Sequence, residues 1–108
     1  MQYWFKKSIS DILYTYDTAI INGSRIVVES KKLRKVYVAL EILHKFNLEL
    51  PSEPRRILTE FIAISNNLAN SLSPKRNGIF SPMYYEGYIN DYEQILKKLR
   101  EIDNRYFV

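Results

Sequence analysis

Apolar residues recur along this chain at alternating steps of three and four, the spacing that keeps side chains on one face of an α-helix. The clearest series is the last one, Tyr85, Tyr88, Tyr92, Ile95, Leu99 and Ile102. Four such segments predict helices over about 3–20, 30–46, 53–72 and 82–103, followed by a short C-terminal tail. Because no helix can bury its own apolar face, the pattern predicts an all-α fold, an antiparallel four-helix bundle in a single domain over 1–108.

The residues expected to point inward share this spacing on the first three helices as well. They are Phe5, Ile9, Ile12, Leu13, Tyr16 and Ile20 on the first helix, Leu33, Val36, Tyr37, Leu40 and Leu43 on the second, and Ile57, Phe61, Ile64, Leu68 and Leu72 on the third.

Turn residues mark the boundaries of the first two helices. Asn22 and Gly23 favour a turn that ends the first helix. The run Arg25–Val28 contains β-branched residues but has no second strand to pair with, so we interpret it as the lead-in to the second helix. Pro51 disfavours helical dihedrals in the residue before it, so the second helix should stop ahead of it.

Serine and proline mark the starts of the other two helices. Ser52 is expected to cap the third helix, with Glu53 and Pro54 in its first turn, where an acid suits the helix dipole and a missing N–H costs little. The segment 73–78 is typical of an exposed loop, and Pro82 after Ser81 repeats the start signal.

The chain offers few residues for catalysis. It has no cysteine, which excludes disulfides, thiolate metal sites and a thiol nucleophile and fits a reducing cytoplasm. The lone histidine, His44, follows the inward-facing Leu43 and is expected to be structural, since no second histidine could complete a zinc site. The three glycines are scattered, so no phosphate-binding loop can form. We therefore expect no enzyme, no metal and no cofactor.

The start of the chain lacks the order of a signal peptide, because Lys6 and Lys7 follow the apolar residues instead of preceding them. No window approaches 18 uninterrupted apolar residues. We expect a cytoplasmic protein that does not span the membrane.

Positive charge is concentrated on the second helix. The net charge is +4, and residues 25–45 carry six of the basic residues against Glu29 and Glu41. This face is either a solubilising surface or an attraction to anionic headgroups or an acidic partner. The candidate residues for an anionic membrane surface are Arg25, Lys31, Lys32, Arg34 and Lys35.

Aromatic side chains make up 14% of the chain. Those around residue 80 and in the tail lie off the helical stripe, so they either fold back on the bundle or form a contact surface. Aromatic residues beside basic ones are frequent anchors of protein interfaces. The candidate partner-binding residues are Lys75, Arg76, Phe80, Tyr84, Tyr106 and Phe107.

The pattern resembles the immunity proteins of class IIa (pediocin-like) bacteriocins, over nearly the full chain. The local similarities lie in Ile9–Tyr16, Lys32–Val36, Arg56–Phe61 and Leu96–Ile102, the last followed by an aromatic tail. Those proteins are small, usually basic, cytoplasmic four-helix bundles that protect lactic acid bacteria from their own antimicrobial peptide.

The resemblance implies a protein that works by binding. It implies action from the cytoplasmic side on the membrane receptor of the mannose phosphotransferase system with its bound bacteriocin. It places specificity in the C-terminal half, here the hairpin of the third and fourth helices and the tail. From the basic surface of the second helix we separately expect peripheral contact with the anionic inner leaflet.

Two other binding functions remain open from the sequence. A secretion chaperone of the flagellin type is also a small helical bundle, and it would form a stable complex with one soluble client. A nucleic-acid-binding domain could use the basic second helix, but the modest charge and interleaved acids argue against it.

Overall fold

The computed structural model describes residues 2–21, 28–73 and 82–106, with side chains over 3–21, 28–73 and 85–102. Within these ranges the chain forms four α-helices and no strand. They are α1 (Gln2–Tyr16), which continues into the π-helical turn η1 (Asp17–Ile21), α2 (Ser30–Asn47), α3 (Ser52–Ser71) and α4 (Pro82–Tyr106). The predicted all-α character and the number of helices are confirmed for the described chain.

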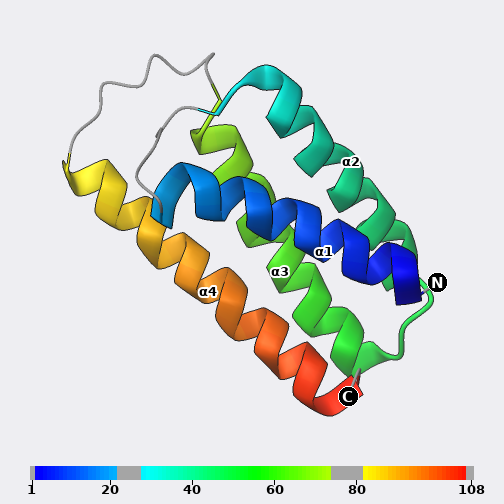
Figure 1. The fold of residues 1–108 in the computed structure, drawn as a ribbon. Coiled ribbons are helices and arrows are strands. Elements are labelled where there is room, and N and C mark those ends of the chain that lie inside the picture. The colour runs from blue at the N-terminus through cyan, green and yellow to red at the C-terminus, as the bar shows by residue number, and fades with distance from the viewer. Residues whose placement is uncertain (1, 22–27, 74–81, 107–108) are drawn as a thin grey trace.

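The helices lie side by side in a molecule about 41 Å long and 24 Å by 20 Å across (Figure 1). The N-terminus, the α2–α3 connection and the end of α4 lie at the same end of the molecule (Figure 1). The segment before α2 is tied to the end of α3, because the N–H of Val28 donates to the carbonyl of Leu72 at 3.0 Å. Val28 is buried and not helical; the rest of the run expected to lead into α2 lies outside the described residues.

The predicted stripes form the core. Most of their members are buried, and six lie half-buried at the edge: Leu13, Tyr37, Ile64, Tyr85, Tyr88 and Leu99. Burying one large apolar side chain contributes about 1.5–3 kcal/mol, so the summed burial is the main stabilising contribution. The predicted stripes omitted Leu58, Ser65 and Ala69 of α3, which are fully buried. This helix therefore buries a wider face than one stripe.

The spacing predicted an α-helix as far as residue 20, but the first helix changes form before that point. Its last turn is π-helical over Asp17–Ile21. Thr15 and Thr18 donate their hydroxyls to the carbonyls of Asp11 and Tyr14, four residues earlier. Such bonds compete with the backbone ladder, and an extra residue in one turn shifts the side chains that follow it. The shift leaves Ala19 and Ile20 both buried.

Two predicted boundaries are wrong. Ser52 is not the N-cap of α3 but its first residue; the cap position is Pro51, and no side-chain hydrogen bond caps the helix. The helix starts one residue earlier because the carbonyl of Pro51 already accepts from the N–H of Arg55.

At the other end of the chain α4 continues to Tyr106 instead of ending at 103, since residues 103–106 contain no glycine or proline to stop it.

A buried hydrogen bond joins α1 to α3. Tyr16 is fully buried, and its hydroxyl donates to the carbonyl of Ser65 and lies 3.0 Å from the Ser65 Oγ. Burial raises the pKa of the Tyr16 phenol above its ordinary value, and the hydrogen bond to Ser65 offsets only part of this rise. The phenol therefore stays protonated and keeps its donor role at neutral pH.

Replacing Tyr16 with phenylalanine should lower the free energy of unfolding by about 1–2 kcal/mol, because the Ser65 oxygens lose a partner in the core. Tyr14→Phe is the matched control: this residue is 73% exposed, so the change should stay within about 0.5 kcal/mol. Urea unfolding monitored by circular dichroism measures both. Equal losses in the two variants would contradict the role of the bond.

Stability should also fall above about pH 10, where tyrosine in an unfolded chain loses its proton. In the folded protein the pKa of the Tyr16 phenol is raised, so the phenol keeps its proton above pH 10. Deprotonation at this pH therefore stabilises the unfolded state alone. Tyr16→Phe should therefore show a shallower decline than the parent chain in urea unfolding measured from pH 8 to 11. Parallel declines would show that Tyr16 does not contribute to it.

Candidate functional site

The basic candidates on α2 form one exposed segment. Lys31, Lys32, Arg34 and Lys35 occupy its first two turns, and all are exposed. The first turn of α2 contains no acidic residue. Positive charge at a helix N-terminus opposes the helix macrodipole, so this arrangement does not serve helix stability. The segment can attract anions. Arg25, the fifth candidate, lies outside the described residues.

The six partner-binding candidates do not form one described patch. Lys75, Arg76, Phe80 and Phe107 lie outside the described residues. Tyr84 is in the first turn of α4 and Tyr106 is its last residue; their backbones are described and their side chains are not. At 1.5 Å per residue, the helix separates these two positions by roughly 33 Å. The structure thus assigns Tyr84 and Tyr106 to opposite ends of α4.

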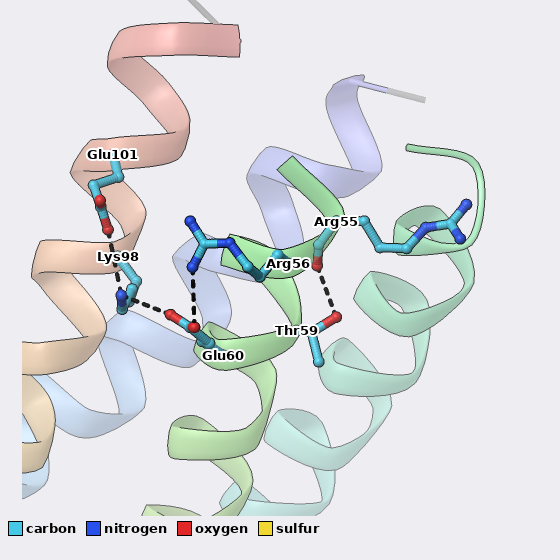
Figure 2. A network of polar contacts seen from close by, with 6 residues as sticks. All are labelled: Arg55, Arg56, Thr59, Glu60, Lys98 and Glu101. Carbon is cyan, nitrogen blue, oxygen red and sulfur yellow. Dashed lines mark hydrogen bonds and ion pairs between the residues drawn. The ribbon is translucent and has the colours of Figure 1, made fainter. Parts of the chain in front are cut away.

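Between these ends, a network of charged side chains joins α3 to α4 (Figure 2). The ammonium of Lys98 lies 2.6 Å from Glu60 Oε2 and 3.5 Å from Glu101 Oε2. Arg56 lies 3.2 Å from the other oxygen of Glu60. The hydrogen bond from Lys98 is the main cause that holds the pKa of Glu60 below its ordinary value. Two positive and two negative charges balance here, so the network aligns the two helices and leaves little charge for a partner.

Further hydrogen bonds fix the start of α3 against the end of α2. Arg55 donates to the carbonyl of Leu48 at 2.8 Å, and Asn47 donates to the hydroxyl of Thr59 at 2.8 Å. Thr59 in turn donates to the carbonyl of Arg55 (Figure 2). These bonds order the α2–α3 connection.

An open groove of about 620 Å³ runs between α1 and α4. It is lined by Phe5, Lys6, Ile9, Ser10, Leu13, Tyr14, Asp17, Tyr92 and Leu99. Burial, and secondarily the charge of Asp17, raises the pKa of the Tyr92 phenol. The lining is largely apolar, with a cation at one end and an acid at the other, which suits an amphipathic helix better than a small polar substrate.

His44 is exposed and lies in a second groove, of about 510 Å³, between α2 and α3. The groove also includes Tyr37, Glu41, Lys45 and Asn66. Over the described ranges, no three side chains of histidine, aspartate or glutamate come together as a metal site would require. None of the helices described is long and apolar enough to cross a bilayer.

Sequence reasoning missed several exposed apolar residues of the first two helices. Tyr3, Trp4 and Tyr14 are 65%, 55% and 73% exposed, and Val38 and Leu48 are also exposed. Their signal was present in the chain, since these residues fall between the positions of the inward stripes, where a solvated helix normally carries polar side chains.

No family model, no curated protein and no solved structure matches this chain.

Replacing Lys98 with methionine should raise the titration midpoint of Glu60 towards that of an ordinary glutamate, because Lys98 makes its shortest ion pair. The control Arg56→Met should raise the midpoint less, since that pair is longer. Carboxyl ¹³C shifts measured by NMR against pH provide the test. The lowered pKa means that the pair's contribution to stability is present above the ordinary glutamate pKa and lost as pH falls through the Glu60 midpoint. An unchanged midpoint in Lys98→Met would contradict this account.

Proposed function

We propose that this protein is a bacteriocin immunity protein that protects its cell by binding, from the cytoplasmic side, the bacteriocin–receptor complex of the mannose phosphotransferase system. It acts as an antiparallel four-helix bundle with no catalytic step. The resemblance of the sequence to class IIa immunity proteins is the basis of this proposal, and the four-helix, all-α chain supports it.

The surface chemistry supports a binding role. The predicted stripes lie in or against the core, so the helices do not need a partner to cover them. Among the described side chains, the exposed basic segment at the start of α2 and the exposed apolar residues of the first two helices remain outside the core. Contact with the receptor involves the α3–α4 connection and the end of α4, while the basic segment faces the anionic inner leaflet.

A secretion chaperone is the second candidate, favoured by the largely apolar groove between α1 and α4. In that function a helix of one soluble client lies in the groove and contacts Leu13 and Leu99. Leu13→Glu would then abolish a stable complex with the client, whereas immunity through the α3–α4 connection and the end of α4 would be retained.

The immunity function is tested by expression in a strain sensitive to class IIa bacteriocins, challenged with a panel of these peptides. The parent chain should protect against at least one peptide. Lys75→Glu with Arg76→Glu should reduce protection, because the reversed charges oppose an interface that needs cations. Lys97→Glu with Arg100→Glu is the matched control, with the same change in net charge at exposed positions of α4.

The end of α4 is tested in the same assay by truncation after Asp103 and by Tyr106→Ala with Phe107→Ala in the full-length chain. The double alanine variant keeps the helix length, so it remains informative if the truncated chain fails to fold, which circular dichroism will show. Both should protect less than the parent. Full protection by the Lys75, Arg76 and alanine variants would exclude this surface, and no protection by the parent chain would exclude the function.

A further inference from the structure

Wherever the structure describes side chains, the large apolar ones that are exposed lie in the first half of the chain. Six large hydrophobic residues are exposed there, and all belong to α1, η1, or α2 with its C-cap residue: Tyr3, Trp4, Tyr14, Ile21, Val38 and Leu48. The described parts of α3 and α4 contribute none. Scattered single apolar residues are ordinary on a protein surface, but their restriction to one pair of helices is not.

Helical spacing places most of these residues with lysines on the outward side of α1 and α2. Tyr3, Lys7 and Tyr14 follow one another at steps of four and seven, opposite the buried stripe of α1. On α2, exposed Val38 has Lys35 one turn before it, and Lys31 and Lys45 two turns away. We call this surface the α1–α2 face and define it by Tyr3, Trp4, Lys7, Tyr14, Lys31, Lys35, Val38 and Lys45.

The two helices present this face together. α1 and α2 lie next to each other (Figure 1). Phe5 in the first turns of α1 packs on Phe46 in the last turn of α2, with ring centroids 4.9 Å apart. This contact holds Trp4 near the end of α2, where Leu48 is also exposed. Trp4 packs edge-on against Tyr3 at 5.3 Å, so two aromatic rings stand together at this end.

Charge is distributed in the same way. In the described part of α1, η1 and α2 with the residues that flank α2, from 3 to 48, seven lysines and arginines oppose four acidic residues. In the described side chains from 49 to 102, five basic residues oppose seven acidic ones. Over the full sequence, residues 49–108 carry eight basic and eight acidic residues, so the net charge of +4 belongs to residues 1–48. The half with the exposed apolar residues is therefore positive and the other half is neutral.

From these observations we infer that the α1–α2 face docks on an anionic phospholipid bilayer, with Trp4 and Tyr3 among the headgroups and the lysines on the lipid phosphates. Tryptophan and tyrosine prefer the membrane–water interface because their rings are amphipathic. Each lysine near an anionic surface adds attraction, and apolar burial adds to it. Apolar side chains alternate with charged ones on this face, mostly lysines, with Glu41 near Val38 and Asp11 paired to Lys7 at 3.4 Å. A fluid headgroup layer accommodates that spacing.

This inference rests on one part of the proposed function, the basic segment of α2 at the inner leaflet, and extends the lipid contact to α1 and the aromatic pair, independently of any receptor. Vesicles contain neither bacteriocin nor receptor. A failure to bind vesicles therefore leaves the proposed receptor contacts at the α3–α4 connection and at the end of α4 untouched, and a failure to protect cells leaves lipid docking untouched.

The chain has one tryptophan, Trp4, so its fluorescence reports the contact directly. The parent protein is mixed with vesicles of phosphatidylglycerol and phosphatidylcholine in equal parts, or of phosphatidylcholine alone. With the anionic vesicles we expect co-sedimentation and a blue shift of Trp4 emission, both weakened by added salt. The neutral vesicles should produce neither effect.

A matched pair of variants tests which face binds. Lys31→Glu with Lys35→Glu should lower vesicle affinity at least about tenfold, since two attractions to the anionic surface are lost and two repulsions replace them. Lys97→Glu with Arg100→Glu makes the same change in net charge on α4 and should stay within about twofold of the parent. Trp4→Ala should lower affinity severalfold in sedimentation. Circular dichroism checks that each variant is folded.

Three results would overturn the inference. The first is the absence of binding or of a Trp4 blue shift with anionic vesicles. The second is an equal loss in the two charge variants, which would reduce the effect to net charge alone. The third is a combination of two observations: the parent self-associates in velocity ultracentrifugation, and Trp4→Ala abolishes this self-association while its vesicle binding stays equal to that of the parent. That result would assign this face to a second copy of the chain.

Discussion

The burial of four apolar faces against one another is the constraint on which the rest of the structure depends. Where that core includes a polar group, the group needs a partner inside it, because an unpaired buried hydroxyl is costly. Tyr16 meets this requirement through Ser65, which is 49 residues away along the chain. The bond allows a large ring to fill the centre of the molecule and fixes how α1 lies against α3.

Because the apolar faces of the helices are buried in the core, the function of the protein depends on the side chains that stay exposed. The two halves of the molecule differ in this respect. Between α3 and α4, Lys98 and its neighbours pair opposite charges and serve the packing of two helices. At the start of α2, lysines and an arginine crowd a helix N-terminus whose dipole disfavours them. Such an arrangement fits attraction to an external anion better than internal stability.

The two proposed surfaces can act at the same time. The inferred lipid contact is on α1 and α2, and the proposed receptor contact is at the α3–α4 connection and the end of α4. If α1 and α2 hold the protein on the bilayer, the proposed contacts at the α3–α4 connection and the end of α4 stay free for a membrane protein. Restriction to a surface also raises the local concentration near an embedded receptor, so modest affinities at both sites can act together.

The sequence by itself determined the four helices, most of the core and the basic segment of α2, because these depend on helical spacing and local composition. The ends of the helices were predicted less well. The N-cap of α3 is not Ser52, and α4 does not end at 103, since helix ends depend on backbone geometry that the spacing of apolar residues does not reveal. Only the tertiary structure decided which off-stripe residues are exposed and which candidates lie together. Leu58 is buried and Trp4 is not. The burial of each residue depends on which helix lies beside it, and the packing of the whole chain determines that neighbour.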